Sequence, residues 1–271
     1  MNDPEPIDVD MFDAHCHLDA MAYRGGRVPD ADFVAEVMTS ARAAGVTRVI
    51  TVGDTVAASR WCVRAAEAHP DVYAAVAVHP TEIDGLDDDG YAELAELAGH
   101  PRVVAVGETG LDYYWDRTRP DQQQAHFRRH IRLAKEVGKP VMIHDRDAHD
   151  DVLRVLAEEG APAPGTVFHA FSGDAGMART CVDAGYVLSF AGVVTFKNAP
   201  GLRAAAAVTP IGSILVESDS PFLAPHPHRG RPNSPAFVPL TLHKVAEVTS
   251  VTPRSLAIGV AATGRRLFGW P

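Results

Sequence analysis

Histidine and carboxylate side chains stand at the ends of short apolar runs along this chain. They are His15, His17, His79, Glu108, His144, His169, Glu217 and Asp219. On a strand, residues two apart point to the same side, so His15 and His17 face together. A group of imidazoles and carboxylates is costly to desolvate unless its charge is compensated, and divalent cations supply that compensation. Imidazole with carboxylate suits Zn²⁺, Mn²⁺ or Fe²⁺, whereas a set made mostly of oxygens suits Mg²⁺ better.

Each of these residues alone has a simpler interpretation. A single histidine at a strand end is more often a hydrogen-bonded interior residue, and a carboxylate after a glycine, as in Glu108, is more often a loop residue or helix cap. Their joint occurrence at strand ends favours a metal site. His79 and Glu217 stay open between an additional metal position and a hydrogen-bonded pair at the rim. Six further histidines fall on expected helices or their edges, where solvation or capping accounts for them: His69, His100, His126, His130, His149 and His243.

Alternation of apolar runs with amphipathic segments predicts the fold. The strand-sized runs are residues 9–13, 46–52, 72–78, 103–107, 140–144, 166–171, 185–190 and 214–218. Helices are expected at 32–44, 57–69, 91–98, 121–137, 148–159, 175–184, 200–208, 239–249 and 253–268. Eight such units predict an α/β fold, a (β/α)₈ TIM-type barrel, which typically needs ~250 residues, with its active site at the C-terminal ends of the strands. We expect one domain over residues 1–271. The rival, a doubly wound open sheet, normally carries a Gly-x-Gly-x-x-Gly turn that the first unit lacks.

Composition limits the partners of the chain. With 25 basic and 35 acidic residues, its formal charge of −10 disfavours a wide duplex-binding surface, because such surfaces neutralise many phosphates. No run approaches the ~18 apolar residues of a membrane span, and the acidic start, residues 1–10, does not resemble a signal peptide. Three widely spaced cysteines, Cys16, Cys62 and Cys181, are typical of reduced thiols. We therefore expect a cytoplasmic protein without membrane contact, and favour a monomer.

Together the motifs around these residues resemble the TatD family of metal-dependent hydrolases. They are Phe-Asp-Ala-His15-Cys-His17-Leu-Asp, Gly-Glu108-Thr-Gly-Leu-Asp-Tyr-Tyr, Ile-His144-Asp-Arg-Asp-Ala, His169-Ala-Phe-Ser-Gly, Glu217-Ser-Asp219-Ser-Pro and Arg229-Gly-Arg231-Pro-Asn233-Ser-Pro. They follow one another in family order from residue 12 to about residue 235. Three positions depart from the usual family pattern: Ala170 stands where Cys is frequent, Ser218 where Thr is usual and Ser234 where an acidic residue is common.

The resemblance implies a barrel with two divalent metals (Zn, Mg or Mn) and phosphodiesterase activity on DNA. Carried over by position, His15, His17 and Asp219 would hold one metal, and His144 and His169 the other. Glu108 would bridge the two. His79 and Glu217 leave room for a third metal.

Chemistry predicts roles for the same residues. Two metals can clamp the attacking and leaving oxygens of a phosphodiester and acidify a water. Asp219 is then expected to be the general base. Arg146, one step outward from His144, is a candidate phosphate contact, as are Arg229 and Arg231 in the long loop; the alternative for each is a solvated surface cation. Tyr113, Tyr114 and Trp115 are placed to stack on bases or to pack against the rim helices.

The function expected from these observations is that of a deoxyribonuclease in DNA repair or degradation. We expect a 3′–5′ exonuclease on single strands or strand ends. The alternative is hydrolysis of an ester or amide, such as the removal of D-amino acids from mischarged tRNA, because the same chemistry attacks carbonyls. A non-catalytic metal-bound scaffold is disfavoured by the intact ligand set.

Overall fold

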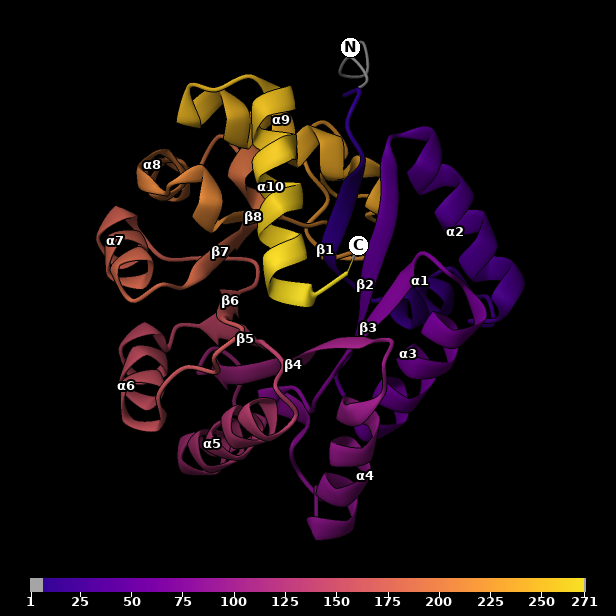
Figure 1. Ribbon diagram of the computed structural model, residues 1–271, viewed down its shortest axis with the longest axis vertical. Coiled ribbons are helices and arrows are strands. Elements are labelled where there is room, and N and C mark those ends of the chain that lie inside the picture. The colour runs from indigo at the N-terminus through magenta and orange to yellow at the C-terminus, as the bar shows by residue number, and fades with distance from the viewer. Residues whose placement is uncertain (1–6, 271) are drawn as a thin grey trace.

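Eight parallel strands make one sheet in which every strand pairs with its neighbours in sequence order (Figure 1). The computed structural model describes residues 7–270, so Pro271 and residues 1–6 of the acidic start lie outside it. The strands are β1 (Met11–Cys16), β2 (Val46–Gly53), β3 (Val72–Val76), β4 (Val103–Asp112), β5 (Val141–Arg146), β6 (Thr166–Phe168), β7 (Val187–Phe190) and β8 (Ile214–Val216). The predicted (β/α)₈ barrel is confirmed.

Helices follow the strands and form the outer layer. They are α1 (Leu18–Arg24), α2 (Ala31–Ala43), α3 (Val56–Ala68), α4 (Asp88–Gly99), α5 (Pro120–Glu136), α6 (His149–Glu159), α7 (Ala175–Asp183), α8 (Pro200–Val208), α9 (Val238–Thr249) and α10 (Pro253–Phe268), with 3₁₀ turns at Pro80–Glu82, Gly192–Thr195, Ile211–Ser213 and Pro235–Phe237. The expected helices are present to within three residues at each end. Seven-residue α1 was not predicted, because it is too short to show a helical period.

Local sequence explains where these helices begin and which face they bury. Helix α5 begins at Pro120, whose fixed φ suits the first helical position. It turns Phe127, Ile131 and Ala134 inward at helical spacing, and all three are fully buried. Helix α4 begins three residues before its predicted start, because the Asp87 side chain accepts a hydrogen bond from the amide of Gly90 at 2.9 Å and caps the first turn.

The seam between β1 and β8 closes the barrel. Beyond the three residues of β8, Asp219 N donates to His15 O at 2.8 Å and His17 N donates to Ser220 O at 2.7 Å. The buried carboxylate of Asp13 also accepts from the amide of Ser218 at 2.8 Å and from its hydroxyl. These bonds set the C-terminal ends of the first and last strands side by side.

Strand β4 continues five residues beyond its predicted end at Gly107, which corrects that boundary. Its continuation passes close to β5, where Gly110 pairs with His144 and Asp112 with Arg146. A Cβ on Gly110 would lie 2.0 Å from the carbonyl oxygen of His144, so only glycine allows this approach. Strands β6 and β8 end earlier than predicted because the backbone turns left-handed at Ala170 and Asp219, with φ values of 38° and 54°.

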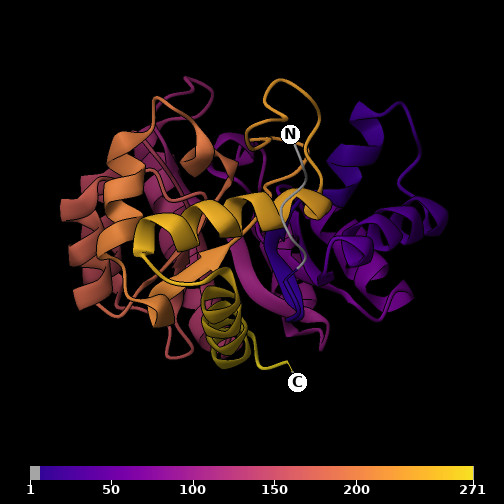
Figure 2. The same ribbon diagram turned by 90° about the horizontal axis from the view of Figure 1, so that it is seen from above.

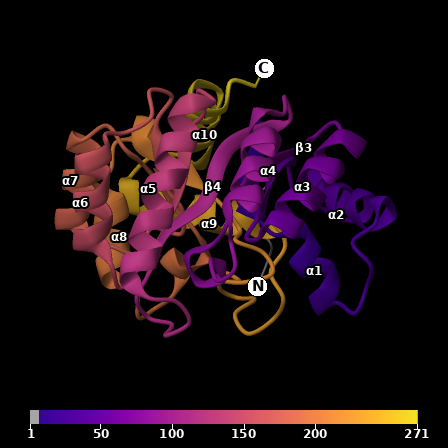
Figure 3. The ribbon, with the colours of Figure 1, turned by 90° about the horizontal axis from the view of Figure 1, so that it is seen from below.

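The C-terminal ends of the strands open on one side of the barrel. Helix α1 and the long loop after β8 project from this side (Figures 2 and 3). Asn233 ties the loop to the strand end, because its side-chain amide donates to Ser218 O at 2.6 Å and to Phe222 O at 2.7 Å. No helix within residues 7–270 is long and apolar enough to cross a membrane.

Candidate metal centre

Four donor atoms, from the end of β1, from β4 and from the segment after β8, meet at the C-terminal ends of the strands. The Nε2 atoms of His15 and His17 are 3.1 Å apart. Glu108 Oε2 lies 3.4 Å from the first of these nitrogens and 3.7 Å from the second. Asp219 Oδ1 lies 3.8 Å and 3.5 Å from the same two nitrogens. Neighbouring ligands of a tetrahedral zinc ion with bonds of about 2.0–2.1 Å are roughly 3.4 Å apart, so this set fits one divalent cation.

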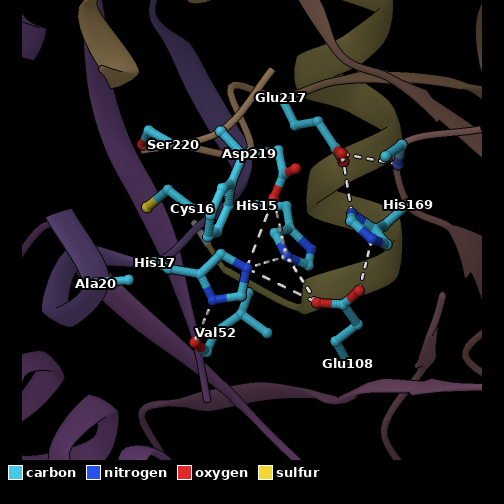
Figure 4. A network of polar contacts seen from close by, with 12 residues as sticks. His15, Cys16, His17, Ala20, Val52, Glu108, His169, Glu217, Asp219 and Ser220 are labelled. Atoms are coloured by element: carbon cyan, nitrogen blue, oxygen red, sulfur yellow. Dashed lines mark hydrogen bonds and ion pairs between the residues drawn. The ribbon is translucent and has the colours of Figure 1, made fainter. Parts of the chain in front are cut away.

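A second set of donors surrounds the other oxygen of the same glutamate. Glu108 Oε1 lies 2.6 Å from His144 Nδ1 and 2.8 Å from His169 Nε2. Figure 4 shows His15 and His17 on one oxygen of Glu108 and His169 on the other. Because each oxygen faces its own imidazole pair, the carboxylate has the geometry of a bridge between two cations.

The remaining ring nitrogens of these histidines are held by neighbouring groups. His17 Nδ1 lies 3.0 Å from Val52 O, and His144 Nε2 lies 2.9 Å from Asp112 Oδ2. Such contacts fix the tautomer and orientation of an imidazole and raise its basicity as a ligand. The rings are therefore oriented before any cation binds.

Glu217 and His79 contact different parts of this cluster. Glu217 is completely buried, and its Oε1 lies 3.1 Å from His169 Nδ1 and accepts from the amide of Ala170 at 2.7 Å. Its Oε2 has no hydrogen-bond partner within residues 7–270. His79 lies instead on the side of His144, with its Nε2 3.6 Å from Glu108 Oε1.

Two carboxylates of this region, Asp13 and Asp112, were not singled out from the sequence. Asp13 shares the strand face of His15 and His17 by its two-residue spacing, so alternation could have found it. Asp112 alternates in the same way with Glu108, but that signal depends on extending β4 through Gly110. A glycine inside a strand pattern normally argues for a break.

Burial and the mixed charges shift the pKa values of these groups. Burial alone would raise the pKa of the Glu108 carboxyl, but His169, His144 and His79 together lower it well below its ordinary value. Burial would lower the pKa of His17, yet Asp219 and Glu108 raise it to about 9. The buried carboxylates therefore require positive charge beside them. Divalent cations can supply that charge in place of protons, because a histidine binds a metal through its neutral form and releases its proton.

The three arginines expected to contact phosphate lie at the end of β5 and in the long loop after β8, on the side of the barrel where the strands end. Arg146 is exposed at the end of β5, and its guanidinium lies 4.0 Å from the centre of the exposed Tyr114 ring. Arg229 covers Phe196 at 4.5 Å, and Arg231 is exposed in the same loop. No ion pair involves these three arginines within the described residues.

A parallel barrel with clustered imidazole and carboxylate donors at its strand ends is typical of a class of metal-dependent hydrolases. The family model described as "TatD related DNase" matches residues 12–269. An uncharacterized metal-dependent hydrolase, TatD, of Mycobacterium tuberculosis is 50% identical, with 96% of this chain and 98% of the relative covered. By these matches the chain belongs to the TatD family of metal-dependent hydrolases.

Two further relatives bear on fold and activity. The crystal structure of the TatD homologue YJJV from Escherichia coli is 28% identical and has a TM-score of 0.88, covering 97% of this chain and 99% of that one. A protein of Citrobacter rodentium named 3′-5′ ssDNA/RNA exonuclease TatD is 31% identical, with 96% of this chain and 98% of the relative covered. The fold and the family thus agree, and one named relative acts on single strands.

Proposed function

We propose that this protein is a metal-dependent deoxyribonuclease that removes nucleotides from the 3′ ends of single-stranded DNA. The observation that carries the proposal is the position of Glu108, whose two oxygens face separate imidazole pairs. A shared carboxylate of this kind suits a pair of cations acting on one phosphodiester. The exonuclease relative from Citrobacter rodentium supports the choice of substrate.

In this proposal His15, His17 and Asp219 hold one divalent cation, His144 and His169 hold a second, and Glu108 is shared. Zn²⁺, Mn²⁺ or Mg²⁺ held by these residues would supply positive charge against the phosphate and would lower the pKa of a water. His79 lies on the His144 side, where a third cation could be held. Glu217 acts through His169 as a positioning residue.

Asp219 is the group proposed to take the proton from the attacking water. Its side chain is 10% exposed, against 5% for Glu108, 2% for Asp112 and 0% for Glu217. It is therefore the carboxylate of the cluster nearest to solvent. Its backbone amide is fixed by His15 O, which keeps the side chain at the open end of the site.

Arg146, Arg229 and Arg231 are proposed to contact the phosphates of the strand. Three arginines at one side of the barrel, in a chain of charge −10, suit a strand end better than a long duplex.

The three cysteines are free and buried, which agrees with a reducing compartment and supports our placement of the enzyme in the cytoplasm.

The proposal is tested by a time course on end-labelled single-stranded DNA with metal-stripped protein. Mg²⁺, Mn²⁺ and Zn²⁺ are restored separately, and His144→Ala is compared with His100→Ala. His100 pairs with Glu67 and precedes the start of β4, so it lies at the opposite end of that strand from Asp112. We expect the strand to shorten from its 3′ end with wild type and His100→Ala, and to stay intact with His144→Ala. Intact DNA under every metal would refute the nuclease and turn attention to aminoacyl esters.

A further inference from the structure

Phe222 is a large apolar side chain left exposed beside a proposed metal ligand. Its ring lies 5.9 Å from the His17 ring, edge to face at 74°, and the residue is 43% exposed. The backbone around it is not loose, because its amide donates to Asp219 O at 2.8 Å and its carbonyl accepts from Asn233 Nδ2 at 2.7 Å. These hydrogen bonds fix the backbone of Phe222 and so keep its aromatic face in solvent at the edge of the site.

A cation accompanies this ring. The guanidinium of Arg24, the last residue of α1, lies 5.2 Å from the centre of the Phe222 ring. Within residues 7–270 Arg24 has no carboxylate partner, whereas Arg27 nearby pairs with Glu36. An aromatic ring covered on one side by an unpaired arginine keeps both a π-face and a charge for a ligand.

The opposite end of the cluster repeats the arrangement. There Arg146 covers the exposed ring of Tyr114, whose amide is bonded to Asp112, the partner of His144. One aromatic–arginine pair therefore adjoins His17 and the other adjoins the contacts of His144. The proposed cations and the phosphate would lie between the two pairs.

We propose that Phe222 is a stacking platform for a nucleobase next to the scissile phosphate, and that Arg24 contacts a neighbouring phosphate of the same strand. This inference rests on the proposed nuclease function. Stacking on an aromatic ring is tolerant of sequence, because every base has a π-face, and it serves single strands whose bases are unpaired. A single ring among charged and polar neighbours is too small to be an apolar protein-docking patch.

The platform is tested with oligonucleotides in which one position at a time near the 3′ end is abasic. Wild type should lose about tenfold or more in kcat/KM when one particular base is missing, in the range found for base–aromatic stacking. Phe222→Leu should lose a similar factor on the intact strand and show no further loss on the abasic one. Phe222→Trp should behave as wild type. Tyr23→Leu, which removes an exposed aromatic one residue before Arg24, is the matched control and should change neither rate.

A binding measurement separates this inference from the nuclease proposal. With metal-stripped protein and a fluorescent oligo(dT), Phe222→Leu should bind about tenfold more weakly than wild type, and equally weakly to intact and abasic strands. Arg24→Gln should reduce the slope of log affinity against log salt by about 0.7, as the loss of one phosphate contact does. If wild type binds oligo(dT) more tightly than Phe222→Leu does but cuts no DNA, the nuclease proposal fails, whereas base stacking on Phe222 stands. If Phe222→Leu lowers activity on intact and abasic strands by the same factor, the platform is refuted.

Discussion

Asp112 illustrates how single residues prepare this site. Its Oδ2 lies 2.9 Å from His144 Nε2, and its Oδ1 accepts from the amides of Tyr114 and Trp115 at 3.0 Å. One carboxylate thus orients a proposed ligand and shapes the loop that carries the exposed aromatics. That the histidines at strand ends cluster could be predicted from their positions, whereas their role as ligands stays a prediction. Asp112 could not, because its role depends on a contact across two strands.

Asp112→Asn should weaken metal binding while leaving the loop in place. An asparagine oxygen still accepts from the two loop amides, but the negative charge that supports His144 is lost. We expect affinity for the second cation to fall about 10- to 100-fold. Competition with a chromophoric chelator measures this. Asp121→Asn, on the exposed turn of α5 beside Arg119, is the control, and equal affinities of the two variants would contradict the role of Asp112.

Asp219→Asn should separate catalysis from binding. The amide oxygen can still face the cation, but it cannot take a proton, so we expect kcat to fall about 10²- to 10⁴-fold. Most bound metal should remain. Rates on single-stranded DNA and metal content by atomic emission give both quantities. A near-normal rate in this variant would remove Asp219 from the role of general base.

At the scale of elements, the meeting of strand ends decides which residues become a site. Most strands could be placed from their apolar runs, and parity correctly grouped His15 with His17. The end of β4 was wrong because Gly110 interrupts the pattern that marks a strand, although its close approach to His144 is what lets β4 continue. Periodicity also could not show the seam of β1 and β8, because its hydrogen bonds join residues from opposite ends of the chain, such as Asp13 and Ser218.

Gly110→Ala tests the importance of that approach. The new Cβ would meet the carbonyl oxygen of His144 at 2.0 Å, at a φ of 141° that side chains rarely adopt. We expect the free energy of unfolding to fall by about 2–4 kcal/mol and the cation beside His144 to be lost. Gly99→Ala, at the open end of α4, is the control and should be neutral or stabilising by about 0.5–1 kcal/mol. Urea unfolding of both variants provides the comparison, and similar stabilities would argue against a tight β4–β5 contact.

The whole molecule is an acidic barrel whose helices carry many surface ion pairs, whereas Arg146, Arg229 and Arg231 form none within residues 7–270. Length and the count of apolar runs were enough to predict the barrel, and composition was enough to predict its charge. They could not reveal interior polar groups such as His130, which we expected to be a helix-surface residue. It is fully buried instead, with Val78 N donating to its Nε2 at 3.3 Å and its Nδ1 lying 2.9 Å from His126 O.

His130 should make global stability depend on pH. Burial lowers the pKa of His130 from 6.5 to about 4. Between pH 6.5 and pH 4 the unfolded chain therefore binds a proton at this residue that the folded protein does not bind. Stability is full above pH 6.5 and falls as the pH drops toward 4. We expect wild type to lose about 2 kcal/mol more than His130→Gln between pH 7.5 and pH 5, from about 1.4 kcal/mol per unit of pKa shift. Urea unfolding with chelator present tests this, and parallel pH curves would contradict it.

The central claim is that Glu108 joins two cation positions in one site, and metal stoichiometry tests it most directly. Metal-stripped protein is titrated with Zn²⁺ and with Mn²⁺, and bound metal is counted per chain. We predict two equivalents for wild type, one for His144→Ala and a loss of tight binding at both positions for Glu108→Ala, with folding checked by circular dichroism. A single equivalent in wild type, or two retained without Glu108, would contradict the account.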